Sequence, residues 1–104
     1  MDNKDCCVIL TTTDKEEVAE LIGKSLVESK LAACVQVDKV ISFFIYDKKT
    51  FKENEFRLMI KAKSSNYKVI EKSIKLIHNY KVPQIIKLDI TDGLDEYINW
   101  IHSK

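Results

Sequence analysis

The chain has 104 residues, of which 45% are hydrophobic and 32% charged, a composition typical of one domain with one core. Its 17 Lys and Arg residues nearly balance 16 Asp and Glu residues, for a formal net charge of +1. This balance, without a long run of one sign, argues against nucleic-acid binding and against a polybasic membrane binder. With 2 Gly and 1 Pro, disordered and collagen-like proteins are excluded as well. We therefore predict a single structured domain over residues 1–104.

The N-terminal region predicts a cytosolic protein with no direct membrane insertion. Residues 1–5 are polar, and the apolar run Cys6–Leu10 is too short for a signal peptide or a transmembrane helix. Cys6 and Cys7 are adjacent, and neighbouring strand residues point to opposite faces. With three cysteines in all, we expect free thiols in a reducing compartment rather than a disulfide framework.

The first predicted elements are a central strand and an amphipathic helix. Residues 6–12 are nearly all apolar or β-branched, as in a strand buried on both faces. Residues 13–17 indicate a helix start, with a hydroxyl or carboxylate N-cap and a glutamate three residues later. The helical spacing of the following positions predicts one buried helix face, comprising Val18, Leu21, Ile22, Ser25 and Leu26.

The next segment predicts a long β-hairpin. Residues 34–46 are rich in β-branched and aromatic types, residues 47–50 form a polar turn, and an alternating strand follows. Arms of a dozen residues at about 3.3 Å each reach ~40 Å, whereas a domain of this size has a radius of gyration of about 13 Å. The hairpin should therefore overhang its core and expose Ile41, Phe43, Phe44, Ile45 and Tyr46. Soluble monomers avoid such surfaces, so we predict a homo-oligomer that shares the hairpin.

The remaining elements complete the predicted topology. Residues 64–66 can cap a second helix, residues 84–91 alternate as a fourth strand, and a short C-terminal helix follows. The order is βαββαβ plus a C-terminal helix, with an antiparallel hairpin between two βαβ halves. We therefore predict an α+β, ferredoxin-like fold. The inward stripe of the second helix is Tyr67, Ile70, Ile74 and Ile77.

Charged residues share one parity of the third strand, and they allow two interpretations. One is a solvated face of the sheet. The other is an oligomer that covers this face, so that the charges line an intersubunit pocket for a small anion. The residues concerned are Glu53, Glu55, Arg57, Lys61 and Lys63.

His78 follows the inward stripe of the second helix and also allows two interpretations. It is either a helix-terminal histidine that interacts with the helix dipole or an imidazole that a rigid loop holds toward a cleft. We interpret His102 as a surface residue. Cys34 resembles a small core residue, and zinc-site spacing is absent. Any transition-metal site must therefore be assembled in three dimensions or between subunits.

The sequence lacks the motifs of the common enzyme classes. It has no G-x-S-x-G, no glycine-rich phosphate loop and no H-E-x-x-H. Residues 11–14 also lack the arginine-bearing anion loop that an acylphosphatase-like hydrolase needs. We therefore predict that the protein is not an enzyme and uses no organic cofactor.

Five short motifs occur in an order that resembles the CutA divalent-cation tolerance family over essentially the whole chain. The resemblance implies a ferredoxin-like subunit in a very stable homotrimer built through the long hairpin. It also implies tolerance to divalent ions and copper binding. The family trimer looks like the PII signalling proteins, which implies the alternative of a sensor for a small anionic metabolite in the intersubunit cleft. The motifs are Leu31-Ala32-Ala33-Cys34-Val35, Glu53-x-Glu55, Ile60-Lys61, His78-x-Tyr80-x-Val82-Pro83 and Tyr97-x-x-Trp100.

Carried over by position, His78 is the family histidine of the His-x-Tyr loop and the implied copper ligand. The positions implied for the cleft are Glu53, Lys61 and Tyr80. This chain departs from the family at Thr11, where some bacterial members place a cysteine implicated in copper binding.

Further departures lie in the hairpin and after the proline. Tyr46 and Lys48 replace the usual Trp and Gly of the hairpin turn, and Gln84 replaces the usual Glu after the proline. These changes concern the implied metal site more than the implied fold.

Overall fold

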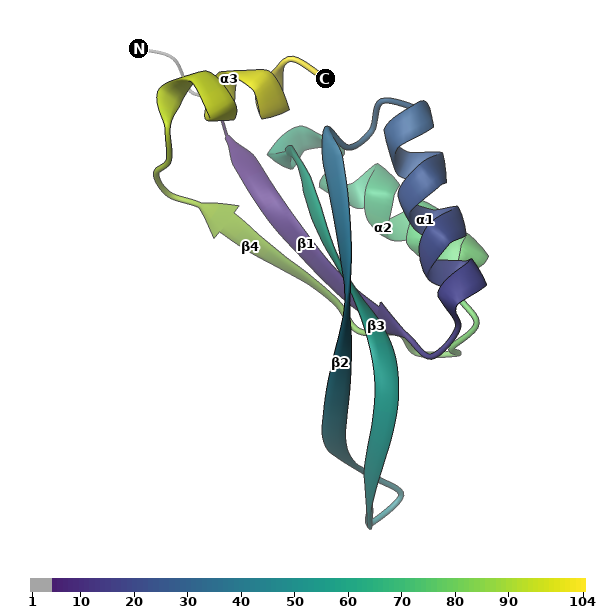
Figure 1. Ribbon diagram of the computed structural model, residues 1–104. Coiled ribbons are helices and arrows are strands. Elements are labelled where there is room, and N and C mark those ends of the chain that lie inside the picture. Colours follow the sequence, from purple (N-terminus) through teal and green to yellow (C-terminus); the bar gives the residue numbers. More distant parts are fainter. Residues whose placement is uncertain (1–4) are drawn as a thin grey trace.

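The computed structural model describes residues 5–104, and its elements follow the predicted order (Figure 1). The four strands form one sheet in the order β2-β3-β1-β4, and every neighbouring pair is antiparallel. This strand order, with helices between the strands, is that of the split βαβ plait, so the predicted α+β fold is confirmed. The elements are β1 (Cys6–Thr13), α1 (Glu16–Glu28), β2 (Cys34–Tyr46), β3 (Lys49–Lys63), a 3₁₀ turn (Ser64–Asn66), α2 (Tyr67–Ile77), β4 (Ile85–Ile90) and α3 (Asp95–His102).

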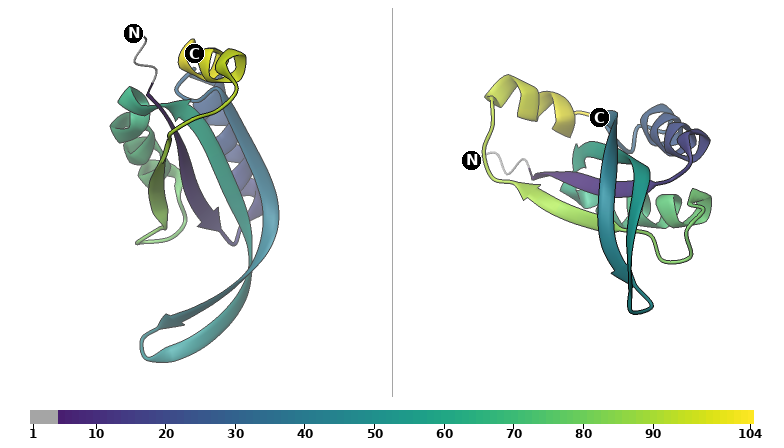
Figure 2. Two further views of the ribbon diagram at one scale, coloured as in Figure 1. Left: turned by 90° about the vertical axis from the view of Figure 1, so that its left-hand side faces the viewer. Right: turned by 60° about the horizontal axis from the view of Figure 1, so that its bottom comes forward.

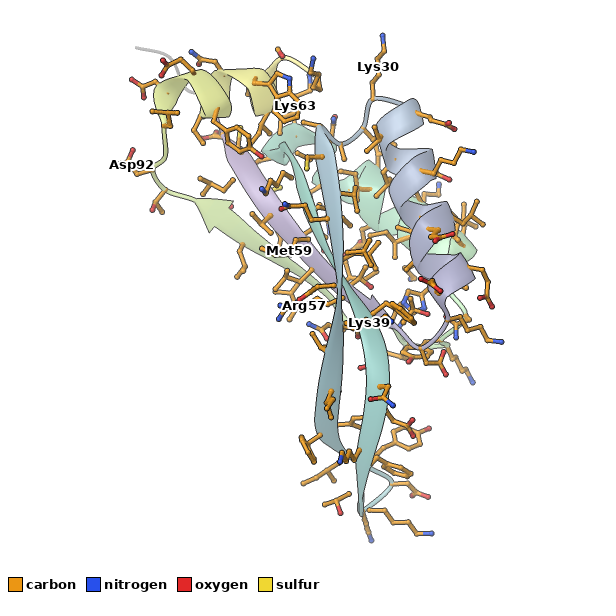
Figure 3. All side chains as sticks on the ribbon, viewed as in Figure 1. Lys30, Lys39, Arg57, Met59, Lys63 and Asp92 are labelled. Carbon is orange, nitrogen blue, oxygen red and sulfur yellow. The ribbon has the colours of Figure 1, made fainter. Side chains whose placement is uncertain are left out.

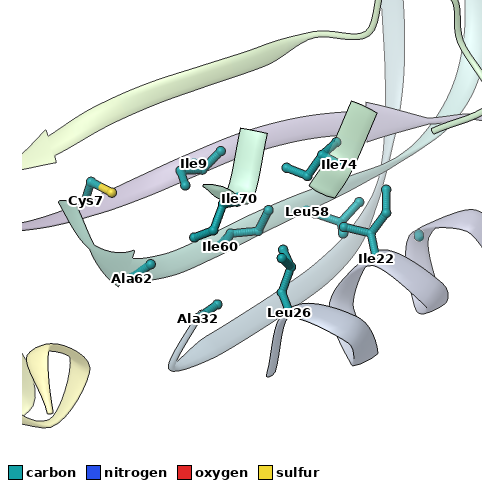
Figure 4. Close-up of a cluster of buried hydrophobic side chains, with 11 residues drawn as sticks. Cys7, Ile9, Ile22, Leu26, Ala32, Leu58, Ile60, Ala62, Ile70 and Ile74 are labelled. Atoms are coloured by element: carbon teal, nitrogen blue, oxygen red, sulfur yellow. The ribbon is translucent and has the colours of Figure 1, made fainter. Parts of the chain in front are cut away.

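The hydrophobic core lies between the sheet and helices α1 and α2, which cover one of its faces side by side (Figures 1 and 2). β1 lies between β3 and β4 and is almost fully buried, as predicted for a central strand. Each fully buried Ile or Leu contributes about 1.5–3 kcal/mol relative to an exposed one. Figure 4 shows this cluster, which includes Cys7, Ile9, Ile22, Leu26, Ala32, Leu58, Ile60, Ala62, Ile70 and Ile74.

Helix α1 is rotated slightly from the predicted face. Ala19 is buried with Ile22 and Leu26, whereas Leu21 is exposed, so the prediction for Leu21 was wrong. Small residues explain the rotation, because they allow the helix to approach the sheet closely. A Cβ added at Gly23 would lie 3.3 Å from Cγ1 of Val35.

The predicted side-chain caps of both helices were also wrong. The N-cap of α1 is Lys15, which makes no side-chain cap; instead its backbone N–H donates to Oγ1 of Thr13 at 3.2 Å. The N-cap of α2 is Asn66, whose side-chain amide donates to the Leu31 carbonyl at 3.0 Å. Both polar side chains serve contacts between elements, which a local pattern cannot distinguish from caps.

The β2–β3 hairpin overhangs the core, as predicted. Pairing of β1 with β3 ends at Thr13↔Phe56, whereas β2 and β3 stay paired to Tyr46↔Lys49. Beyond β1, residues 40–55 form a two-stranded ribbon, which Figures 1 and 2 show extending away from the rest of the chain. The molecule measures 50 × 25 × 21 Å, and its radius of gyration of 14.5 Å exceeds the value of about 13 Å for a compact domain of this size.

The hairpin turn is shorter than predicted. Only Asp47 and Lys48 lie between the two strands, with φ angles of 51° and 64°. Two successive left-handed residues characterise the type I′ turn, whose twist matches that of the strands and which favours Asn-Gly or Asp-Gly.

Replacing Lys48 with Gly is therefore expected to stabilise the protein by about 0.5–1 kcal/mol, because glycine adopts a positive φ without steric cost. Urea unfolding of both proteins measures the change. Lys52→Gly, within β3, is the matched control, and there glycine should lower stability by a similar amount. A loss of stability in both variants would contradict the strain assigned to Lys48.

The sheet face opposite α1 and α2, termed the open face, is apolar at its centre. Along it, Val8 pairs with Leu88, and Leu10 lies between Met59 and Ile86. Ile86 and Leu88 are 45% and 49% exposed. Helix α3 lies across only one end of the sheet (Figure 1), and Figure 3 shows Met59 on the side away from α1 and α2. The open face is therefore a second apolar surface besides the ribbon.

Candidate functional site

His78 caps the C-terminus of α2 and lies beside the end of β1. Its backbone N–H donates to the Ile74 carbonyl at 2.8 Å, and its own φ and ψ of −62° and 142° end the helix. The extended conformation turns the following loop, residues 79–84, back toward β1. The imidazole is thereby held against the end of β1 by the loop.

Both ring nitrogens of His78 are engaged. Nδ1 accepts a hydrogen bond from the backbone N–H of Tyr80 at 3.0 Å, and Nε2 lies 2.8 Å from the Thr12 carbonyl oxygen. Because a carbonyl can only accept, Nε2 carries the proton and the imidazole is neutral. The side chain therefore joins β1 to the loop after α2.

The surroundings of His78 favour this neutral form. Burial lowers the pKa of His78, although the hydrogen bond to Thr12 and the charges of Asp14 and Glu55 act in the opposite direction. A proton on Nδ1 would also face the Tyr80 N–H, with which it cannot form a hydrogen bond. At physiological pH the imidazole is thus in the protonation state that a metal ligand needs, but its lone pair is already used.

Tyr80 connects the hydrogen bonds of His78 to the base of the ribbon. Its hydroxyl donates to Oε2 of Glu55 at 2.6 Å, and its ring packs against His78 with centroids 4.9 Å apart. Burial, followed by the hydrogen bond and charge of Glu55, raises the pKa of Tyr80, so the phenol keeps its proton. Glu55 is only 7% exposed, and it borders a groove of about 680 Å³ at the base of the ribbon.

The interpretation of a solvated charged face is therefore wrong at Glu55. The alternation along β3 placed this residue with four charged neighbours, but β1 ends before it and the loop after α2 covers it. Glu53, two residues further along the ribbon, is exposed. Only the position of Tyr80 in space identifies Glu55 as part of the site.

Further hydrogen bonds hold the same loop, and they include Asn79, which the sequence analysis did not single out. The Asn79 amide donates to Oδ1 of Asp14 at 2.8 Å, and the Thr13 hydroxyl donates to Oδ1 of Asn79 at 2.5 Å. The Thr12 hydroxyl lies 3.4 Å from Oε1 of Gln84. We call the group formed by residues 12–14, Glu55 and residues 78–80 the β1-end cluster.

The predicted cleft residues do not meet within one subunit. Lys61 lies near α3, with Nζ 3.1 Å from the Tyr97 hydroxyl and 5.2 Å from the centre of its ring. Glu53 lies eight positions away on the same strand, a separation of about 26 Å at about 3.3 Å per residue. Tyr80 belongs to the β1-end cluster. A cleft with all three residues would need contributions from a neighbouring subunit.

The described residues of one subunit contain no preformed metal site. Within residues 5–104 no three His, Cys, Asp or Glu side chains are grouped so as to hold an ion. Cys6 and Cys7 are buried, and burial raises the pKa of both thiols. Thr11 is also fully buried, and within the same residues its hydroxyl has no hydrogen-bond partner. One subunit thus does not fit a copper ion without rearrangement or a donor from another subunit.

Tyr80→Phe tests the importance of the β1-end cluster for stability. The variant leaves the buried Glu55 carboxylate without its donor, and we expect a loss of about 1–3 kcal/mol, measured by urea unfolding. Tyr97→Phe, which removes a more exposed hydroxyl, should cost less than about 1 kcal/mol. In the double variant Tyr80→Phe, Glu55→Met most of the loss should be recovered. Equal losses at Tyr80 and Tyr97 would contradict this role of Glu55.

The helices of residues 5–104 include none that is both long and apolar enough to span a membrane.

Comparison with known proteins gives consistent matches. The family model described as CutA1 divalent ion tolerance protein matches residues 7–104. The divalent-cation tolerance protein CutA of Thermus thermophilus is 36% identical over 95 residues, which cover 90% of this chain and 92% of that protein. The protein of the same name from Archaeoglobus fulgidus is 37% identical over 93 residues, covering 89% of this chain and 91% of the relative.

Solved structures agree with the sequence matches. The Archaeoglobus fulgidus structure, described as a periplasmic divalent cation tolerance protein CutA, has a TM-score of 0.90 at 35% identity and covers 94% of this chain and 96% of its own. The Cut A1 structure from Thermus thermophilus has a TM-score of 0.88 at 34% identity, with 92% and 94% of the two chains covered.

Proposed function

Because the chain belongs to the CutA1 family of divalent ion tolerance proteins, we propose that it provides divalent-cation tolerance as a homotrimer that binds copper through His78. Family membership is the observation that carries the first part of this proposal. The relatives are named as tolerance proteins rather than as enzymes. The assembly and the ion are argued from the residues below.

The exposed apolar ribbon supports an oligomer. Phe43, Ile45 and Tyr46 are 74%, 75% and 70% exposed in the isolated subunit. Large exposed apolar surfaces of this kind mark protein–protein contacts. The open face adds Ile86 and Leu88 to the surface that needs a partner.

The edges of the sheet support a cyclic assembly. β2 and β4 are the two edge strands, so each presents backbone N–H and C=O groups to a neighbour. If β2 of one subunit pairs with β4 of the next, the contact is heterologous and can close into a ring. A ring of three subunits is the assembly that the family resemblance implies.

The chemistry around His78 supports copper as the ion. Copper and its neighbours in the Irving–Williams series favour neutral imidazole nitrogen, and carboxylates can complete their coordination. The charges of Asp14 and Glu55 act on His78. An ion must compete with Tyr80 N–H for the lone pair of the imidazole. We therefore expect weak binding that includes donors from more than one subunit.

Native mass spectrometry of metal-free protein with added copper tests both parts. We expect a trimer that takes up about one copper per subunit and releases it in acid, where imidazole is protonated. His78→Gln keeps an amide donor for the Thr12 carbonyl but removes the imidazole, and it should lose the copper while remaining trimeric. His102→Gln is the matched control. Equal uptake by the His78 and His102 variants would contradict the role of His78, and a monomeric wild type would contradict the assembly.

The family match does not favour the PII-like alternative, because the relatives are named as divalent-cation tolerance proteins. The cytosolic location stays a prediction, which fractionation of the producing cells would test.

A further inference from the structure

The two helices that cover the core present opposite charges to solvent. On α1 the exposed charged side chains are four glutamates and one lysine: Glu16, Glu17, Glu20, Glu28 and Lys24. On α2 three exposed lysines, Lys68, Lys72 and Lys75, face solvent beside the half-buried Glu71. The outer surface of α1 is therefore acidic and that of α2 basic. We call the outer surfaces of these two helices together the helix layer.

Apolar side chains accompany both charged surfaces. Leu21 and Val27 of α1 are 53% and 41% exposed, and Val69 and Leu76 of α2 are 52% and 81% exposed. Leu76 lines a shallow groove of about 500 Å³ together with Glu71 and the three lysines. Exposed Leu and Val beside charges are typical of a contact surface with a polar surround.

The charged side chains of the helix layer form few ion pairs within the subunit. Lys68 lies 3.9 Å from Glu71, a long and exposed pair. Among residues 5–104, neither Lys72 nor Lys75 has a carboxylate within 4.0 Å, and neither does the α1 lysine, Lys24. The acidic and basic surfaces are thus complementary, although within residues 5–104 no ion pair joins α1 to α2.

The arrangement of the helices allows a second copy of the chain to contact the acidic and the basic surface at the same time. α1 and α2 lie side by side on one sheet face and run in opposite directions (Figures 1 and 2). If two helix layers face each other about a twofold axis parallel to the helices, α1 of each copy lies over α2 of the other. The same acidic-on-basic contact then forms twice, as in an isologous interface.

We propose that the helix layer docks on the helix layer of a second copy of this chain, with α1 of each copy against α2 of the other. The proposed ring is built from the sheet edges, the open face and the ribbon, so it leaves the helix layer on the outside. The docking depends on the proposed assembly in this respect alone. It does not depend on copper. Since each ring would carry several helix layers, the contact links rings into larger assemblies.

Sedimentation velocity at two salt concentrations tests this contact. The Debye length falls from about 10 Å at 0.1 M salt to about 3 Å at 1 M, so exposed charge pairs between copies weaken strongly. For the wild type we expect a weight-average mass that rises with protein concentration at 0.1 M salt and stays constant at 1 M. The mass at 1 M salt reports the ring alone, so failure of the ring and failure of the helix-layer contact give different results.

Charge reversal supplies the matched controls. Lys72→Glu with Lys75→Glu makes both helices acidic, and Glu17→Lys with Glu20→Lys makes α1 basic; each pair should abolish the mass increase at 0.1 M salt. The variant with all four substitutions restores complementarity and should regain it, which also shows that the separate pairs did not fail by unfolding. A wild-type mass that is independent of salt, or a fourfold variant that does not associate, would overturn the proposal. If vesicles of anionic lipid then bind the wild type but not the lysine variant, the α2 surface belongs to a membrane instead.

Discussion

Replacing Phe43 and Ile45 with Asp is expected to convert the proposed trimer into monomers. The two side chains share one face of the ribbon and are about three-quarters exposed in the isolated subunit. Burial of such side chains contributes about 1.5–3 kcal/mol each, and a charge placed in the contact adds a desolvation penalty. Because every subunit carries the change, the loss would be repeated at each contact of the proposed ring. Light scattering during size-exclusion chromatography at high salt measures the mass.

Leu94→Asp is the matched control for this experiment. Leu94 is 70% exposed and precedes α3, away from the ribbon. It therefore receives the same chemical change without touching the hairpin, and the variant should keep the wild-type mass. If the double ribbon variant also keeps that mass, the ribbon is not the oligomer contact. If the wild type is itself a monomer, the ribbon must stay soluble in another way.

His78→Ala is expected to lower the free energy of unfolding by about 2–4 kcal/mol at neutral pH in metal-free buffer. The variant removes two hydrogen bonds, each worth about 0.5–1.5 kcal/mol, and leaves a gap beside the Tyr80 ring. Tyr80 N–H and the Thr12 carbonyl also lose their partner. Urea unfolding measures the loss, and His102→Ala, at the C-terminal end of α3, should change stability by less than about 0.5 kcal/mol.

The same substitution should weaken the dependence of stability on acid pH. The pKa of His78 in the folded protein lies below its ordinary value of 6.5, so the unfolded chain binds a proton more readily than the folded one. The stability contribution of the neutral imidazole is therefore complete above about pH 6.5, and it is lost progressively as pH falls below that value. Between pH 7 and 5 the wild type should lose more stability than His78→Ala. Parallel curves for the two proteins would contradict this assignment.

The fold could be predicted from sequence because its strongest signals are local. The bounds of β2 agree with the prediction, since β-branched and aromatic residues fill it from Cys34 to Tyr46. The overhang followed from length alone. The predictions failed where contacts with a distant segment decide the environment of a residue. Leu21 is exposed because Ala19 and Gly23 bring α1 close to β2. Asn66 contacts Leu31 rather than capping α2.

The site was predicted less completely, for the same reason. His78 stood out because it follows an apolar stripe and precedes Tyr80, which is a local pattern. Glu55 and Asn79 acquire their roles only where the loop after α2 meets the end of β1. Both ring nitrogens of His78 are hydrogen-bonded to backbone groups, those of Thr12 and Tyr80. Backbone groups are the same in every residue but proline, so the sequence pattern does not predict these two bonds.

The sheet order also sets the order in which the chain can fold. β2 and β3 are joined by a two-residue turn, so they can pair soon after synthesis, whereas β1 needs β3 on one side and β4 on the other. The pair Cys6↔Ile90 joins the first strand to the last, and such long-range pairing slows folding. A nascent chain therefore carries a formed hairpin, with its apolar ribbon uncovered, before the sheet behind it can close. Synthesis of β4 lets the sheet close, but the ribbon stays exposed in the isolated subunit, so chaperone contact would protect it from aggregation until a partner covers it.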